Sequence, residues 1–223
     1  MSTKRKTINI VLIIILIALA VLLSFYYFNK ANDKKSMKKL LKNEEKIINN
    51  NIQSNQNEEE ITIPTEQELE ENEDSIDNYT TIGILEIPSL NIKYPILSET
   101  SNAALKISIA KYWGANPNQV GNMVVIGHNY ENSYMFSNLP NIKLGDEIKI
   151  TDNTGKTLIY KVYETKVIDP YDNDCTSQLT NGRIEVTLIT CFDGGKNRFY
   201  AKAYAEWLLL ICILIFYVLA FEL

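Results

Sequence analysis

The chain has 223 residues, a formal net charge of −5 and 46% hydrophobic residues, which leaves room for one moderate domain plus additional segments. It contains no basic patch with interleaved aromatic residues, so nucleic-acid binding is not expected. Its three cysteines cannot form the disulfide framework of a small secreted domain.

The first segment, residues 7–28, is almost entirely apolar and follows the basic tripeptide Lys4-Arg5-Lys6. It is long enough to cross a bilayer as a helix. A cleaved secretory signal is the alternative, because a basic start also fits one. However, the apolar stretch is longer than a signal core, and Phe25-Tyr26-Tyr27-Phe28 lacks the small residues of a cleavage site. We therefore predict an N-terminal tip and an uncleaved membrane anchor over residues 1–29.

Residues 30–78 are polar and strongly charged. Seven lysines lie between residues 30 and 46, whereas residues 55–77 carry ten acidic residues and no basic one. This composition predicts a solvated stalk, with a short helix possible over residues 37–48. Lysine counting alone would keep the downstream side in the cytoplasm, but a long folded domain translocates largely regardless of charge. The residues alone leave the orientation open.

From residue 79 onward the pattern favours β structure. Alternating and apolar runs bounded by turn residues predict strands at 80–87, 92–97, 123–126, 147–151, 158–168, 183–190 and 198–205. Pro95 interrupts the second of these and indicates an edge or a bend. Residues 102–111 have helical spacing and predict a helix against the sheet. Many short strands with little helix indicate a mixed, mostly antiparallel barrel or sandwich over residues 79–206.

The last segment, residues 207–223, is almost wholly apolar and about as long as the shortest spanning helices. A buried terminal strand or helix is the alternative, but the run has neither strand alternation nor a polar face. We therefore predict a C-terminal membrane segment, in which Cys212 is an inert apolar side chain. Cys175 follows the loop-forming Asp172-Asn173-Asp174. It is either an incidental loop thiol or a redox partner of Cys191.

Three residues could form a reactive site: His128, Cys191 and Arg198. His128, the only histidine, follows the apolar strand 123–126, and Cys191 follows strand 183–190. A cysteine reacts as its thiolate and needs a proton acceptor within hydrogen-bond reach. Two strand ends on one face of a barrel can supply this contact. Arg198 begins the next strand after a six-residue loop, so a hairpin would bring its guanidinium to the same rim, where it can stabilise an oxyanion.

Taken singly, each residue has an ordinary alternative as a buried thiol, a structural imidazole or a surface cation. Together, Thr187-Leu188-Ile189-Thr190-Cys191, the following Arg198 and the upstream Gly127-His128 resemble the signature of sortases. These are membrane-anchored cysteine transpeptidases of Gram-positive bacteria. The run from Gly83 to Pro88 is similar to the family's first strand, and Pro95-Ile96 to its second. The resemblance covers about residues 79–205.

The resemblance implies an eight-stranded β-barrel with short helices, on the extracellular face of the cell membrane. Cys191 would attack a threonine carbonyl in the sorting signal of a surface protein, giving a thioester. His128 would protonate the leaving amine and later accept a proton from the incoming one. Arg198 would hold the substrate carbonyl and the oxyanion, and Thr190 would line the substrate site. The acceptor would be a peptidoglycan precursor or a pilin amine.

No cofactor is expected, and no metal, because the scattered acidic residues form no recognisable cage. Two alternative functions stay open. One is a membrane-tethered cysteine endopeptidase, in which water resolves the thioester, and the other is a non-catalytic surface interaction domain. A C-terminal membrane segment is frequent in pilus-building sortases. Residues 61–78, however, lack the Asp-Pro-aromatic lid motif of those enzymes, so a pilin-polymerising role is not favoured.

Overall fold

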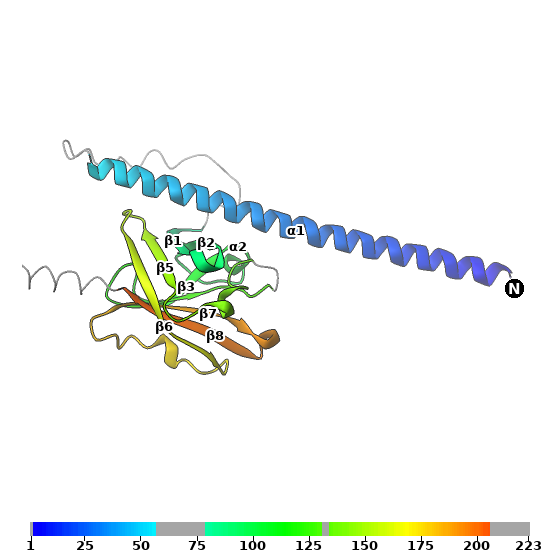
Figure 1. The fold of residues 1–223 in the computed structure, drawn as a ribbon. Coiled ribbons are helices and arrows are strands. Elements are labelled where there is room, and N and C mark those ends of the chain that lie inside the picture. The colour runs from blue at the N-terminus through cyan, green and yellow to red at the C-terminus, as the bar shows by residue number, and fades with distance from the viewer. Residues whose placement is uncertain (1, 57–78, 131–133, 206–223) are drawn as a thin grey trace, which may run out of the picture.

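The structure is a computed structural model that describes residues 2–56, 79–130 and 134–205. Within these residues, one long helix lies beside a closed barrel of eight strands (Figure 1). The acidic residues 57–78 and the predicted C-terminal membrane segment 207–223 lie outside the described residues. The division of the chain into anchor, stalk, catalytic domain and terminal segment stays a prediction.

The barrel strands follow one another around the wall in the order β1-β2-β3-β4-β7-β8-β6-β5. β2 is parallel to β3 and β4 is parallel to β7, whereas the other neighbouring strands run antiparallel. The mostly antiparallel barrel is confirmed. The strands are β1 (Thr81–Ile87), β2 (Ile92–Leu97), β3 (Ile109–Gly114), β4 (Gly121–Ile126), β5 (Glu147–Asp152), β6 (Thr157–Ile168), β7 (Ile184–Phe192) and β8 (Asn197–Ala205).

The helices are α1 (Ser2–Gln56) and α2 (Ala104–Ile107), and short 3-10 turns lie at Pro88–Leu90, Leu139–Asn141, Asp174–Thr176 and Asp193–Gly195. The barrel interior is filled by alternate residues of the strands, as the two-residue period of a strand requires. On β7 these are Ile184, Val186 and Leu188, all in the main core. Burial of each such side chain stabilises the fold by about 1.5–3 kcal/mol.

One predicted element is wrong. The helix expected over residues 102–111 is limited to α2, and Ile109 begins β3. The apolar spacing of this segment fits a helix locally, but pairing of β3 with both β2 and β4 takes precedence. Pro95, predicted at an edge or a bend, lies opposite Ile84 of β1, and the pairing of β2 with β3 begins only at Ile96. The missing N–H of Pro95 therefore interrupts no bond in the pairing with β3. The carbonyl of Pro95 instead accepts a hydrogen bond from the Ser108 hydroxyl at 2.6 Å.

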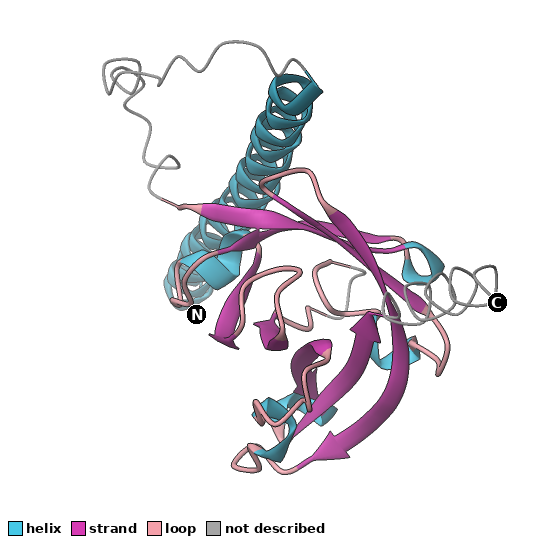
Figure 2. Cartoon of the chain, turned by 90° about the vertical axis from the view of Figure 1, so that its left-hand side faces the viewer, coloured by secondary structure: helices cyan, strands magenta, loops and turns pink. Residues whose placement is uncertain are grey.

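Helix α1 joins the apolar N-terminal segment to a part that packs on the barrel. The views in Figures 1 and 2 show it along one side of the barrel, over β1, β2 and α2. The side chains of residues 15–28 are exposed. In the described part of the chain, α1 is the one helix long and apolar enough to cross a membrane. The same helix therefore contains the predicted anchor and the first part of the predicted stalk.

The barrel-facing side of α1 carries Met37, Leu40 and Ile48, which are 8%, 6% and 5% exposed. Their spacing of three to four residues, or multiples of it, puts them on one helix face. Met37 joins the main core, and Leu40 packs in a smaller cluster with Leu97. In this region the structure thus shows a docked amphipathic helix where the overall composition had suggested a solvated spacer. The few apolar residues of this segment are enough for docking on the barrel, because they align on the buried face of the helix.

A buried acid lies in the contact between α1 and the barrel. Glu44 is fully buried, and the Thr81 hydroxyl donates a hydrogen bond to its Oε2. Its Oε1 has no hydrogen-bond partner among the described residues. Burial, which disfavours the charged carboxylate, raises the pKa of Glu44, and this outweighs the opposing effect of the Thr81 hydrogen bond. The neighbouring Glu45 instead forms an ion pair with Lys93 at 2.7 Å.

We expect Glu44→Gln to stabilise the fold at neutral pH. A pKa raised by folding means that stability is highest at low pH and is lost as the pH rises from the unfolded value, about 4.3 for glutamate, through the folded pKa. Glutamine is neutral at every pH, so the variant should not lose stability in this way as the pH rises. Thermal unfolding of the detergent-solubilised chain between pH 4 and 8 measures it, with Glu45→Gln as the matched control. A lower melting temperature for Glu44→Gln than for wild type at pH 7 would contradict this expectation.

Candidate active site

Three adjacent strands bring the predicted site residues to one end of the barrel. β4 runs parallel to β7 with Ile126 opposite Ile189, and His128 follows two residues beyond this pair. Cys191 is the penultimate residue of β7 and lies directly opposite Arg198 of β8. His128 is therefore on the β4 side of Cys191, and Arg198 is on its β8 side.

The connection between β7 and β8 is tighter than the six-residue loop expected. β7 continues through Cys191 to Phe192, and β8 begins at Asn197. The turn between them contains three consecutive positive φ angles, 50° at Asp193, 61° at Gly194 and 90° at Gly195. Glycine adopts this conformation without a steric penalty. The predicted hairpin placement of Cys191 and Arg198 at the same rim is confirmed by their register.

Hydrogen bonds continue the contact between β4 and β7 beyond the end of β4. The Gly127 N–H donates to the Ile189 carbonyl at 3.2 Å, and the Thr190 hydroxyl donates to the Gly127 carbonyl at 2.8 Å. The Asn129 Nδ2 donates to the Cys191 carbonyl at 3.0 Å. The residues on both sides of His128 are thus attached to the backbone of β7 at or beside Cys191.

Thr190 was predicted to line the substrate site, and that role stays a prediction. The structure shows a side chain that is 2% exposed, with its hydroxyl bound to the Gly127 carbonyl. Gly127 itself has no room for a side chain. A Cβ atom there would lie 2.8 Å from both Ile109 Cγ2 and Phe136 Cδ2. The glycine before His128 therefore permits close packing of this segment on the core.

His128 is partly buried, and its ring centroid lies 5.0 Å from that of Tyr130. Burial lowers the pKa of His128, because it disfavours the charged imidazolium. The imidazole is therefore mainly neutral at pH 7 and able to accept a proton. Cys191 is partly buried and is a free thiol.

The Arg198 guanidinium is held by the turn that precedes it. Its Nη1 donates to the Gly195 and Asn197 carbonyls, both at 3.0 Å. These bonds restrict a long and otherwise flexible side chain. A guanidinium fixed beside Cys191 can stabilise negative charge on a carbonyl oxygen during acyl transfer.

Next to Arg198, a recess opens between the outer face of the barrel and the connection from β6 to β7, residues 169–183. Its apolar lining includes Ile126, Ile168 and Ile189, from β4, β6 and β7. Ile189 and Cys191 are two residues apart and so lie on the same face of β7. An extended peptide in this recess would therefore lead toward Cys191. The full lining is Tyr112, Ile126, Ile168, Pro170, Asp172, Asn173, Cys175, Thr176, Ile189 and Arg198.

Sequence reasoning missed several residues around this recess. Tyr112 lies in β3 where the register with β4 shifts between Lys111 and Trp113, a bulge of the kind that redirects side chains. Both Tyr112 and Trp113 are exposed. The sequence predicted a helix over this segment, and a bulge occurs only in a strand. The bulge at Tyr112 was therefore not foreseen. Asn129, which binds the Cys191 carbonyl, was also missed, although its position directly after His128 was a possible indication.

Cys175 is buried rather than presented by an open loop. It is 5% exposed and packs with Ile168 and Tyr200. Burial raises the pKa of its thiol. Cys175 and Cys191 are both free thiols in this structure.

Comparison with known proteins gives a consistent result. The sequence model of the sortase domain matches residues 85–206. The chain is similar to sortase A of Bacillus anthracis, with 30% identity over 127 residues, or 55% of this chain and 58% of the relative. It is also similar to sortase D of Bacillus subtilis strain 168, with 28% identity over 111 residues, or 49% of this chain and 54% of the relative.

The chain thus spans somewhat more than half the length of these curated relatives. Among solved structures, a Clostridium perfringens sortase D5 transpeptidase matches with a TM-score of 0.52 and 30% identity, over 56% of this chain and 78% of that protein. The family match covers β2 to β8 entirely and includes the strand ends that carry His128, Cys191 and Arg198. On this match, which extends over more than half of its residues, the chain belongs to the sortase family.

Proposed function

We propose that the chain is a cysteine transpeptidase in which Cys191 is the nucleophile. The observation that carries this proposal is the register of three strands: Cys191 of β7 lies opposite Arg198 of β8, and His128 follows the end of the neighbouring β4. Cys191 is also two residues beyond Ile189, which lines the apolar recess together with Arg198. Acyl transfer needs a nucleophile, a group that exchanges protons and a fixed positive charge for the oxyanion. These three residues supply one each, and membership of the sortase family supports the assignment.

In the first half-reaction, the neutral His128 takes the proton of the Cys191 thiol, and the thiolate attacks a peptide carbonyl to form a tetrahedral oxyanion beside Arg198. The C–N bond then breaks, His128 gives this proton to the leaving amine, and a thioester remains on Cys191. In the second half-reaction, an amine attacks the thioester carbonyl while His128 accepts its proton. The C–S bond breaks, the new amide leaves, and His128 returns the proton to the Cys191 thiolate.

The substrates we propose are surface proteins with a sorting-signal peptide, and the acceptor is a peptidoglycan precursor or a pilin amine. The apolar recess suits an extended segment with an apolar side chain before the scissile bond. Thr190 would line the substrate site. The apolar part of α1 would anchor the protein in the cell membrane, with the barrel on the extracellular face. Docking of α1 on β1 and β2 would then hold the barrel near the membrane surface.

The test is to incubate the detergent-solubilised chain with a pentapeptide library, with and without triglycine or a lysine peptide. We expect a mass increase on Cys191 that corresponds to the acyl part, and a ligated product when the amine is added. Cys191→Ala and Arg198→Ala should each lower turnover by orders of magnitude. Cleavage without ligation would replace transpeptidation by endopeptidase activity. Unchanged turnover in Cys191→Ala would refute the proposal.

We expect His128→Ala to impair amide substrates more than activated esters. An amine leaves only after protonation, so loss of the proton donor should reduce amide cleavage by about a hundredfold or more. An aryl ester with the same acyl part releases a stable phenolate and should lose less. The measurement is kcat/KM for both substrates with both proteins. An equal loss on the two substrates would argue against a proton-donor role.

We expect Asn129→Ala to reduce kcat/KM by about tenfold, equivalent to ~1.4 kcal/mol. The substitution removes the hydrogen bond that fixes the Cys191 carbonyl beside the His128 segment. Asn141→Ala, a change of the same type at an exposed position, is the control. If both variants retain wild-type kcat/KM, this bond does not contribute to the site.

A further inference from the structure

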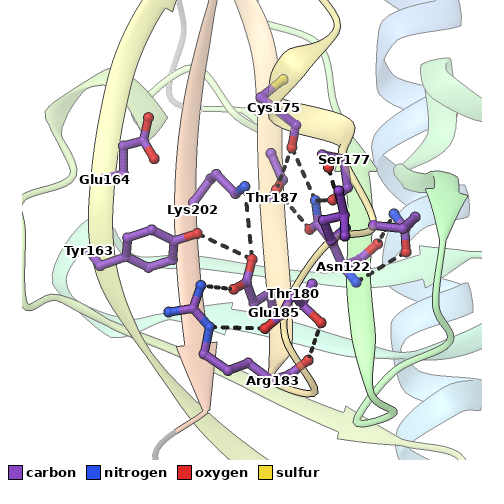
Figure 3. Close-up of polar contacts among 12 residues, drawn as sticks. Asn122, Tyr163, Glu164, Cys175, Ser177, Thr180, Arg183, Glu185, Thr187 and Lys202 are labelled. Carbon is purple, nitrogen blue, oxygen red and sulfur yellow. Dashed lines mark hydrogen bonds and ion pairs between the residues drawn. The ribbon is translucent and has the colours of Figure 1, made fainter.

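One buried side chain of β4 attaches the wall of the recess to the barrel. Asn122 is fully buried. Its Nδ2 donates to the carbonyls of Cys175 and Ser177, both at 3.1 Å. Its Oδ1 accepts a hydrogen bond from the Thr187 hydroxyl of β7 at 2.8 Å. Figure 3 shows Asn122 between β7 and the connection that carries Cys175 and Ser177.

The backbone of Asn122 makes a second pair of contacts with the same connection. Its N–H donates to the Gln178 Oε1 at 3.2 Å, and its carbonyl accepts from the Gln178 Nε2 at 2.8 Å. Three loop residues, Cys175, Ser177 and Gln178, are thus attached to one strand residue. Two of the recess-lining residues, Cys175 and Thr176, lie at or beside these attachment points.

The end of the connection has a separate anchor, also visible in Figure 3. Glu185 of β7 is buried at 2% exposure and forms an ion pair with Arg183 at 2.7 Å. The Tyr163 hydroxyl donates to its Oε2 at 3.2 Å, and the Lys202 Nζ lies 3.8 Å from the same oxygen. Strand pairing fixes the start of the connection at Ile168. The middle of the connection, which forms the recess wall, is held by the Asn122 hydrogen bonds and by the Thr187 hydroxyl, which lies 3.2 Å from the Cys175 carbonyl.

The side-chain donors of Asn122 are directed to the connection, whereas its side-chain acceptor is bound by Thr187 of β7. Burial of an amide is unfavourable unless its donors and acceptor are satisfied. Here both donors are satisfied by loop carbonyls. Asn122 lies four residues before Ile126, so it is about 13 Å from that end of β4 at ~3.3 Å per residue. Direct participation in chemistry at Cys191 is therefore excluded by distance.

We infer that Asn122 is a positioning residue for the peptide substrate. It holds the Cys175–Thr176 segment over Ile168 and Ile189, so that the recess has its binding shape before a peptide arrives. Preorganisation of this kind improves binding, because the cost of ordering the loop is met during folding. The inference rests on the proposed function, in which this recess receives the acyl part of the substrate.

The test compares Asn122→Asp with wild type in steady-state kinetics on the peptide that acylates Cys191. Aspartate keeps the size and the acceptor of asparagine but lacks the two N–H donors. We expect KM to rise about tenfold while kcat changes less than about twofold, since two hydrogen bonds of moderate strength are lost. Unchanged KM in a folded Asn122→Asp protein would overturn the inference.

Asn118→Ala is the matched control. Asn118 is likewise a buried asparagine, at 6% exposure, and its Nδ2 donates to the Lys156 carbonyl at 2.8 Å and the Asp152 Oδ2 at 3.0 Å. It therefore secures the turn between β5 and β6, away from the recess. We expect its substitution to lower the melting temperature but to leave KM unchanged. An equal increase in KM for both variants would mean a general loss of structure and would also overturn the inference.

A second measurement does not depend on activity. In a Cys191→Ala background, the rate of Cys175 alkylation by iodoacetamide can be followed by peptide mass spectrometry of the full chain. Loss of the Asn122 bonds should expose the buried thiol and increase this rate several-fold, whereas Asn118→Ala should not. Equal rates of Cys175 alkylation with and without the Asn122→Asp substitution would refute the positioning role. If wild type acylates on no peptide, the proposed function fails, while the labelling result still decides whether Asn122 holds the loop.

Discussion

Hydrogen bonding between β4 and β7, in parallel register from Gly121–Ile184 to Ile126–Ile189, sets the position of every residue at the site. Parallel strands end on the same side of a sheet, and the chain must cross over to join them. In this protein the crossover contains β5 and β6. For this reason His128 and Cys191 lie at the same end of the barrel although sixty-three positions separate them in the chain. β8 then adds Arg198 through a tight antiparallel hairpin, on the other side of Cys191.

The same strand pair also organises the substrate side. Two asparagines of the β4 segment act at opposite ends. Asn129 binds the carbonyl of Cys191, and Asn122 binds the carbonyls of the loop that covers the recess. Each bond contributes about 0.5–1.5 kcal/mol, but an unmade bond at a buried amide costs more. The two amides therefore favour the arrangement in which the carbonyls of Cys191 and of the loop lie beside them.

Helix α1 connects the apolar N-terminal segment to the barrel. Its apolar N-terminal part and its docked part belong to one continuous helix, Ser2–Gln56, without an intervening break. Met37 and Leu40 give the docked part its apolar contacts, while burial of Glu44 in the same contact raises the pKa of its carboxyl group. Near the start of the docked part, the Lys34 ammonium lies 5.9 Å from the ring centroid of Tyr134. Tyr134 is in turn 5.9 Å from Tyr130, which neighbours His128. Helix α1 is therefore linked to the segment after His128 by the cation–π contact of Lys34 with Tyr134.

The sequence by itself determined the β class, most of the strands and the three residues with potential chemistry, because two-residue alternation and reactive side chains are local properties. It also determined that Cys191 and Arg198 share a rim, since a short hairpin allows few registers. The pairing of β4 with β7, the bulge at Tyr112 and the docking of α1 were decided by tertiary structure. The segment of β3 was misassigned because its helical spacing is a local signal, whereas its strand partners are distant. The role of Asn122 depends on a loop more than fifty residues away. Only the closed barrel brings those carbonyls to its amide, and a buried amide requires such partners.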